Sequence, residues 1–412
     1  MWMLVKLSWR SLWRNRRRTL ITICSIALGM TCALFFIALA DGMYKKLINQ
    51  AVRMEAGHVA VEHPEYRDAP AIDRFTYSVA AVRDAAAKIR GVERVKPLIL
   101  GQAVVSTGSG SAGVGLTAVD PEAEQATSVL AHKIVDGRYI AADDRRGVVL
   151  GKSLAERLKL EPGKKLVVTT NDVHGELVNE LLRVTGVFET GMDEVDSFMI
   201  QVPLGVGRRI FHLETDQATR VGLILENPDD QQRVQQELVA ALQGKPVAVL
   251  PWQEVLPDLA SYIAVDGGSN YVFQGIIMFL IGFTILNTIL MSVLERKREF
   301  ATLLAIGTSP LLLRLQILVE SAFLGLFGCV AGLAVGGGLA HHLEVNGLDM
   351  SELFKDGASV AGFTIDPLVR ADLTVGLMTW LGIAVFLGTM IIGLYPAFKS
   401  SRVEIADVLR TH

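Results

Sequence analysis

Four stretches of the chain are almost continuously apolar, and the segments between them are mixed or polar. A membrane-spanning helix needs about 20 consecutive apolar residues, because its backbone polar groups must be satisfied within the helix. Each stretch is long enough, and only the third contains an acidic residue, Glu320. We therefore predict four spanning helices, at residues 20–40, 271–294, 317–340 and 373–398.

The segment between the first and second spans, residues 41–270, has a different pattern. Apolar positions at helical spacing continue from the first span to about Gly57, which predicts a stalk helix. Beyond it, helical patterns interleave with strand-like runs, so an α+β domain with two subdomains is expected. Residues 266–270 contain two glycines and are expected to form a hinge before the second span.

Lysine and arginine residues are distributed unevenly around the four spans. Residues 1–19, 295–316 and 399–412 are rich in basic residues, whereas residues 341–372 form an acidic loop. Basic residues next to spans mark the cytoplasmic side, so we expect residues 41–270 and 341–372 to be periplasmic. Three tryptophans among the N-terminal basic residues predict an amphipathic helix at the cytoplasmic membrane surface.

The composition agrees with a membrane protein that carries one large polar domain. Half of the residues are hydrophobic and 20% are charged, against roughly 25% charged in average soluble chains. A net charge of -3 is untypical of a nucleic-acid-binding protein. Cys24, Cys32 and Cys329 all fall inside predicted spans, so they are interpreted as packing residues and no disulfide framework is expected.

No pattern in the sequence indicates catalysis or metal binding. The eight histidines match no zinc-binding spacing. Gly151, Lys152 and Ser153 resemble the end of a phosphate-binding loop, but Arg146 stands where the first glycine of that loop is required. The chain is therefore expected to be non-catalytic and to hold no metal or cofactor of its own.

The segment that joins the second and third spans has the most specific pattern. Its first five residues are charged, an apolar helix-favouring run follows, and Gly307 and Pro310 then end the helix. We expect a short amphipathic helix that docks a partner; the alternative is a basic loop without a partner. The candidate docking residues are Glu295, Arg296, Lys297, Arg298, Glu299, Leu303, Leu304, Ile306 and Gly307.

The third span has two further features. A glycine recurs every fourth residue, at Gly328, Gly332 and Gly336. This spacing lets two helices approach closely, although glycine is also generally enriched in spans. Glu320 lies about one turn inside the span, and an acid there is a functional candidate. We expect it to pair with Arg314 or Arg298, or else to extend its carboxylate to the membrane surface.

These segments together resemble ABC transporter permeases of the FtsX-like group, which includes the MacB and LolC/LolE types. Residues 295–307, with the sequence ERKREFATLLAIG, resemble the coupling helix of those permeases. Residues 8–19 resemble their basic lead into the first span, and residues 395–410 resemble their C-terminal ending. The layout of one span, a large outer domain and three more spans is similar to that of LolC/LolE-type lipoprotein-releasing permeases.

The resemblance implies a mechanism and a set of partners. Two permease chains, identical or related, would pair, and each would bind a separate cytoplasmic ATPase subunit that carries ATP and Mg. Motion of the ATPase subunits would pass through the spans and stalk helices to the periplasmic domain. In the coupling helix, Glu295, Arg296, Arg298 and Glu299 would face the ATPase, and Leu303, Leu304 and Ile306 would hold the helix on the membrane side. The implied location is the bacterial inner membrane, with both termini cytoplasmic.

Three functions remain open at this point. The first is extraction of lipoproteins or lipids from the inner membrane, with or without a periplasmic carrier. The second is MacB-like mechanotransmission efflux with a periplasmic adaptor. The third is FtsX-like regulation of a periplasmic cell-wall hydrolase. The size of the outer domain, and the expectation of a separate ATPase chain, favour the first over the second.

Overall fold

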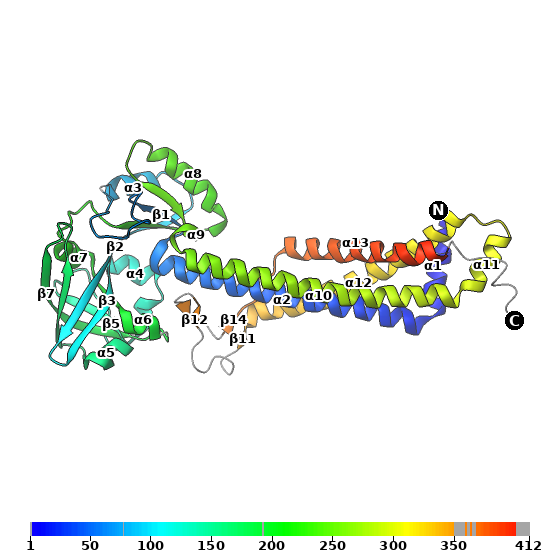
Figure 1. Cartoon of the computed structure of the whole chain (residues 1–412), viewed down its shortest axis with the longest axis horizontal. Helices are drawn as coiled ribbons and strands as arrows, with labels where there is room; N and C mark the ends of the chain where they lie inside the picture. Colours follow the sequence, from blue (N-terminus) through cyan, green and yellow to red (C-terminus); the bar gives the residue numbers. More distant parts are fainter. Residues whose placement is uncertain are drawn as a thin grey trace. The chain divides into compact units, whose positions relative to one another are not determined.

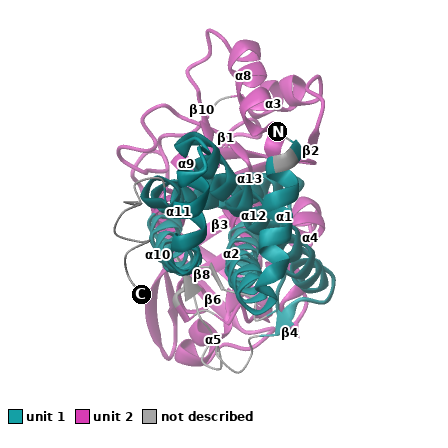
Figure 2. Ribbon diagram, turned by 90° about the vertical axis from the view of Figure 1, so that its right-hand side faces the viewer, with its two compact units in different colours: residues 1–45, 265–353, 367–412 teal, residues 46–264, 354–366 magenta. Residues whose placement is uncertain are grey.

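The computed structural model describes residues 2–76, 78–191, 193–349, 359–360, 363–364 and 368–400. The chain divides into two compact units, which Figure 2 shows in teal and magenta. We call them the helical unit (Met1–Lys45, Val265–Leu353, Pro367–His412) and the β-rich domain (Lys46–Ala264, Phe354–Asp366). The predicted tail and part of the predicted 341–372 loop lie outside the described residues, as does the C-terminal motif beyond residue 400.

Four helices are long and apolar enough to cross a membrane, which confirms the prediction of four apolar spans (Figure 1). They are α2 (Arg16–Ala51), α10 (Pro257–Glu295), α12 (Pro310–Asn346) and α13 (Val375–Ser400). Helix α1 (Trp2–Arg14) precedes them, and the short helix α11 (Lys297–Ala305) connects α10 to α12. Their shared core includes Ile26, Met30, Ile289, Phe300 and Leu324.

The predicted hinge at residues 266–270 is wrong, because α10 runs through it without a break. Glycine costs only about 1 kcal/mol in a helix interior, and tertiary contacts outweigh that cost here. The Tyr44 hydroxyl donates a hydrogen bond to the carboxylate of Asp266. About two turns further along, the buried side-chain amide of Gln274 donates to the carbonyl oxygen of Ala33 at 3.0 Å. These bonds hold α10 against α2 on both sides of the glycines.

At its other end α2 continues as a single π-helical turn, Val52–Ala56, and stops at Gly57. Gly57 has a φ of 70°, which glycine adopts without strain. A Cβ at this position would also lie only 2.5 Å from the backbone nitrogen of Leu223. The chain therefore turns sharply into the first strand of the β-rich domain.

The β-rich domain is built on ten connected strands. The strand order is β10-β1-β9-β2-β3-β8-β5-β7-β4, and β6 pairs with both β2 and β7. The strands are β1 (Val59–Glu62), β2 (Val92–Thr107), β3 (Gly110–Val119), β4 (Ile134–Gly137), β5 (Gly147–Gly151), β6 (Lys165–Asn171), β7 (Leu177–Phe188), β8 (Met199–Pro203), β9 (Arg220–Leu225) and β10 (Ala248–Pro251). Because β6 links β7 back to β2, six of these strands form a closed ring.

The long strand β2 belongs to two packed regions. Its first half pairs with β9, next to β1 and β10, whereas its second half pairs with β3 and β6 in the ring. One core lies within the ring and includes Ile99, Val114, Leu166 and Ile200. A second core lies between β1, β9 and two helices, and includes Val82 and Leu238.

Short helices complete the fold. In the β-rich domain they are α3 (Val79–Ala86), α4 (Pro121–Thr127), α5 (Lys152–Leu158), α6 (Asp193–Phe198), α7 (Leu204–Phe211), α8 (Gln231–Ala241) and α9 (Trp252–Val255), with single 3-10 turns at Leu130–His132 and Pro228–Asp230. Two small two-stranded sheets pair β11 (Leu348–Asp349) with β14 (Leu368–Val369) and β12 (Ser359–Val360) with β13 (Phe363–Thr364).

Candidate functional site

The connection between α10 and α12 is a short helix that is separated from both by breaks in the helical backbone. The backbone of Arg296, at φ -98° and ψ 12°, interrupts the helix after Glu295, and α11 starts at Lys297. Helix α11 ends before Gly307, whose φ of 97° favours glycine. Ser309 then begins α12, because its hydroxyl accepts a hydrogen bond from the backbone N–H of Leu312. The chain thus leaves one span and enters the next through an independently oriented element.

The buried face of α11 differs from the expected one. Phe300 and Ala301 are fully buried in the core of the helical unit, and Leu304 is half-buried. Ile306 is 79% exposed and Leu303 is exposed as well, so the helical unit does not bury these two residues, which were expected on the membrane side. Phe300, Ala301 and Leu304 follow one another at helical spacing and form the inward face of α11, whereas Leu303 and Ile306 lie outside it.

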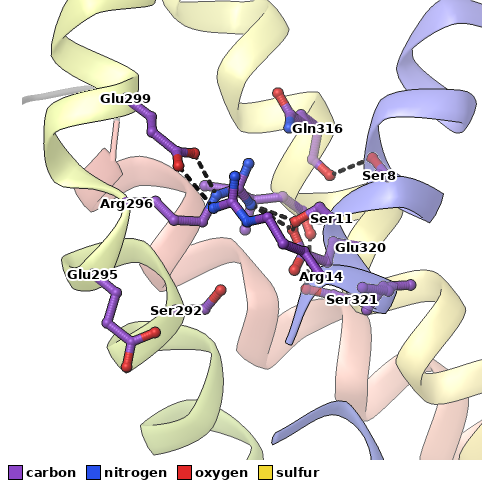
Figure 3. Close-up of polar contacts among 12 residues, drawn as sticks. Ser8, Ser11, Arg14, Ser292, Glu295, Arg296, Glu299, Gln316, Glu320 and Ser321 are labelled. Carbon is purple, nitrogen blue, oxygen red and sulfur yellow. Dashed lines mark hydrogen bonds and ion pairs between the residues drawn. The ribbon is translucent and has the colours of Figure 1, made fainter. Parts of the chain in front are cut away.

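Arg296 points inward and lies at the centre of a polar network (Figure 3). Its guanidinium donates to the Ser11 hydroxyl at 2.6 Å and pairs with Glu320 at 3.3 Å and with Glu299 at 3.1 Å. The same group lies 5.0 Å from the ring centroid of Phe300. Because only 11% of the Arg296 side chain is exposed, it does not face a cytoplasmic partner as expected.

Further ion pairs connect this network to α1 and to the start of α2. Arg14 pairs with Glu299 at 2.8 Å, and Arg18 pairs with Glu295 at 2.5 Å. Arg18 also donates to the hydroxyl of Ser292 at 2.7 Å. We call the set with three guanidinium and three carboxylate groups the arginine cluster, and it consists of Arg14, Arg18, Arg296, Glu295, Glu299 and Glu320.

The cluster determines the charge state of Glu299 and the partner of Glu320. Partial burial opposes ionisation of Glu299, but hydrogen bonds from Arg14 and Arg296 outweigh it and hold its pKa below the usual value. Glu320 pairs with Arg296, so the expected pairing with Arg314 or Arg298 is wrong. Arg314 instead lies over the Phe398 ring, 4.8 Å from its centroid.

The outward face of the connection carries the remaining predicted docking residues. Lys297 and Arg298 are exposed at the start of α11, and Leu303, Ile306 and Gly307 are exposed at its end. This surface combines two cations with apolar side chains. Such a mixture is typical of a protein-binding surface, where an apolar centre is surrounded by a polar rim.

Comparisons with known proteins identify the class of molecule in which this connection occurs. Residues 19–241 match the family of MacB-like periplasmic core domains, and residues 271–405 match the FtsX-like permease C-terminal family. The chain belongs to the FtsX/MacB group of ABC transporter permeases.

Relatives of this permease cover most of its length. It is 25% identical to "Lipoprotein-releasing system transmembrane protein LolC" of Xylella fastidiosa, over 94% of this chain and 92% of that protein. It is 24% identical to the LolC protein of Neisseria meningitidis, over 77% of this chain and 76% of that one. It is 23% identical to "Probable export ATP-binding/permease protein MacB" of Pseudomonas entomophila, over 88% of this chain but 55% of that protein.

Sequence reasoning missed four residues that position α11 in the permease. They are Ser11, Arg14, Arg18 and Phe300. A signal was present for Ser11 and Arg14, since a spacing of three residues places them on one side of α1, whereas Arg18 belongs to α2. The sequence contains no corresponding signal for their partners, which belong to α10, to α11 with its preceding residue Arg296, and to α12.

The glycines of α12 lie against α2 in the permease. A Cβ on Gly328 would lie 2.5 Å from Ile26, and one on Gly332 would lie 2.6 Å from the Cβ of Met30. A Cβ on Gly336 would lie 3.0 Å from the Cα of Thr31. These distances leave no room for a larger residue unless the helices move apart.

The β-rich domain of the permease contains a cavity of about 660 Å³. Its lining combines apolar side chains, among them Phe198, Met199 and Phe211, with amide and hydroxyl groups such as Gln102 and Thr117. Within the described ranges, no three His, Cys, Asp or Glu side chains lie close enough to share a metal ion.

The segment that resembles a phosphate-binding loop forms the corner between β5 and α5. Lys152 pairs with Glu189 at 2.7 Å, and the Ser153 hydroxyl donates to Asp193 at 2.7 Å. Both side chains therefore have carboxylate partners within the β-rich domain.

Proposed function

We propose that this permease transmits the movement of a separate cytoplasmic ATPase to its β-rich domain in order to extract lipoproteins or lipids from the bacterial inner membrane. Two relatives that carry the name of a lipoprotein-releasing system support this cargo. Their similarity extends over spans and outer domain alike. In this proposal ATP and Mg bind to the partner ATPase, and the permease itself is non-catalytic.

The observation that carries the proposal is the way α11 is held. Phe300 and Ala301 bury one face of the helix, while Lys297 and Arg298 lie on the exposed face. Ion pairs of the arginine cluster connect this short helix to α1 and α12, and Arg296 joins it directly to the end of α10 in the chain. A partner that moves α11 would therefore move the ends of three other helices together.

The proposed assembly contains two permease chains, identical or related, and two ATPase subunits. The basic residues of α1 and α11 favour a cytoplasmic location for this end of the helical unit. The β-rich domain would then be periplasmic, where a carrier protein or an adaptor has access to it. The cavity lined by Phe198 and Phe211 would offer an apolar contact surface there.

Charge reversal on the exposed face of α11 tests the coupling role. The double variant Lys297→Glu/Arg298→Glu should insert and fold normally but lose co-purification of the ATPase. Both positions lie at the exposed start of α11, whereas Glu299 belongs to the arginine cluster and would disturb the fold. Lys6→Glu/Arg17→Glu is the matched control, because both residues are exposed and outside α11. Full ATP-dependent function of the α11 variant would refute the docking role.

The match to MacB-like periplasmic core domains favours a second candidate, efflux with a periplasmic adaptor. Depletion of the permease separates the two functions. Lipoproteins should accumulate in the inner membrane if the permease extracts them. Normal lipoprotein sorting combined with sensitivity to drugs or peptides would instead support efflux.

A further inference from the structure

A groove between α1, α2 and α12 plays no part in the arginine cluster or in the exposed face of α11. Its volume is about 390 Å³, within the range of about 300–1,000 Å³ that is typical of ligand pockets. All of its lining residues belong to the helical unit. The lining surface is almost entirely carbon, and the main contributors are Trp9, Trp13, Leu20, Ile23, Phe327 and Val330.

Helix α1 packs against α12 (Figure 2), and together with α2 these helices form the walls of the groove. The ring of Trp9 contacts those of Phe323 and Phe327, with centroid distances of 5.7 and 5.8 Å. The turn from α1 into α2 is fixed by the Thr19 hydroxyl, which donates to the carbonyl oxygen of Leu12 at 2.7 Å. Rigid rings and a fixed turn preform the walls, so an occupant would lose little affinity to reorganisation.

The groove opens toward the surroundings of the spans. Trp13, Leu20 and Val330 are each about half exposed, although all three are apolar. Helices α2 and α12 are both long and apolar enough to cross a membrane. In a bilayer, exposed apolar side chains of these helices, such as Leu20 and Val330, would lie at the depth of the acyl chains. An occupant that enters from this side therefore has an apolar tail.

One charged side chain, Arg16, lines the groove. Its guanidinium carbon lies 6.0 Å from the ring centroid of Trp13. Arg14 and Arg18, on either side of it in sequence, are paired with carboxylates of the arginine cluster. Arg16 has no carboxylate partner in the part of the chain that the structure describes. The groove thus combines an apolar channel with an uncompensated positive charge.

We propose that this groove binds one anionic glycerophospholipid, with an acyl chain along the apolar lining and the phosphate on Arg16. A guanidinium matches the geometry of a phosphate group and can donate two hydrogen bonds to it. Tryptophans beside the site suit the boundary between headgroups and acyl chains. Because α1 also supplies Ser11 and Arg14 to the coupling helix, a bound lipid would brace that connection. This consequence rests on the proposed function, but the binding site does not.

Native mass spectrometry of the full-length chain in detergent tests the site directly. The probes are phosphatidylglycerol and phosphatidylcholine with identical acyl chains. We expect tighter binding of phosphatidylglycerol, and a loss of about fivefold in its affinity in Arg16→Gln. Val330→Trp should weaken both lipids, because it fills the groove. Arg17→Gln is the matched control, since this neighbouring arginine does not line the groove, and it should bind like the wild type.

Three results would overturn the proposal. Equal affinity of the wild type for the two lipids would show that the charge of the headgroup is not recognised. An Arg17→Gln effect as large as that of Arg16→Gln would show binding to diffuse surface charge. Dissociation of a dimer in Val330→Trp, with lipid binding unchanged, would show that a second copy of the chain fills the groove. None of these readouts depends on an ATPase partner.

Discussion

The permease uses two sets of ion pairs that differ in their access to water. In the β-rich domain, Lys96 pairs with Glu124, and the two side chains are 2% and 0% exposed. Lys96 also donates to the carbonyl oxygen of Arg53 at 2.7 Å, in the π-helical turn that ends the first long helix. In the arginine cluster, by contrast, Arg14 and Glu299 are 58% and 45% exposed.

This difference in exposure implies that the buried pair is costly to break, whereas the exposed pairs can break and re-form easily. Removing one partner of a buried pair leaves an uncompensated charge and costs about 3–5 kcal/mol, whereas an exposed pair contributes about 0–1 kcal/mol. Glu124 holds Lys96 in place, and the hydrogen bond from Lys96 to the Arg53 carbonyl ties the end of the stalk to the sheet. The outer pairs of the arginine cluster can break and re-form, which suits the movement that we propose for this connection.

The largest expected effect is that of Lys96→Met. It leaves the buried Glu124 without its cation, so we expect the β-rich domain to lose about 3–5 kcal/mol of unfolding free energy. Hydrogen exchange of β2 and β9 in the full-length chain, measured against urea concentration, gives this value. The double variant Lys96→Met/Glu124→Leu should recover most of the loss. A loss below about 1 kcal/mol in the single variant would show that this buried pair contributes no more than an exposed ion pair.

A slightly smaller loss of stability is expected at low pH, because His58 resists protonation in the folded domain. Burial lowers its pKa from 6.5 to about 4, and its Nδ1 accepts a hydrogen bond from the backbone N–H of Leu225. The unfolded chain takes up this proton near pH 6.5, so stability is complete above that pH and falls as the pH drops toward 4. The loss is roughly 3 kcal/mol. His58→Gln should flatten this part of the pH profile of domain unfolding; an unchanged profile would assign the slope to other groups.

Arg296→Gln tests the one largely buried pair of the arginine cluster. The change leaves Glu320 with a hydrogen bond from the Ser11 hydroxyl but without its arginine, so we expect a loss of about 1–3 kcal/mol in the stability of the helical unit. Thermal unfolding in detergent is the measurement, and Arg296→Gln/Glu320→Gln should recover part of the loss. Arg298→Gln, on the exposed face of α11, is the control and should leave stability unchanged. Equal effects of the two single variants would remove the distinction between inward and outward arginines.

The contrast between Arg296 and Arg298 also shows how far the sequence could be interpreted. Hydropathy predicted the four apolar helices because membrane spans require long apolar runs. It could not predict which arginine points inward, since that depends on the break in the backbone at residue 296. Nor could it show that Lys96 is buried, because its partner Glu124 belongs to a helix that only tertiary folding brings alongside.

The same limit explains the wrong hinge prediction at residues 266–270. Glycine and serine favour turns locally, and the local pattern contained nothing to oppose them. The bonds of Asp266 to Tyr44 and of Gln274 to the backbone of Ala33 are contacts between distant segments. The same holds for the candidate site. The existence of α11 could be predicted from its own residues, but its buried face could not, because that face depends on contacts with distant helices.

The smallest expected effect is that of Arg14→Gln, which removes an exposed partner of Glu299. Salt and water screen this pair, so a loss of about 0–1 kcal/mol is expected, decreasing further at high ionic strength. The lowered pKa of Glu299 fixes the sign of the pH dependence. The pair contributes above the usual value of 4.5 and is lost as the pH falls through the lowered pKa, so wild type and variant should converge in acid. Thermal unfolding at several salt concentrations and pH values checks this. A large, salt-independent loss would mean that the pair of Arg14 and Glu299 is as costly to break as a buried one. The arginine cluster would then hold α1 as rigidly as Lys96 holds the stalk.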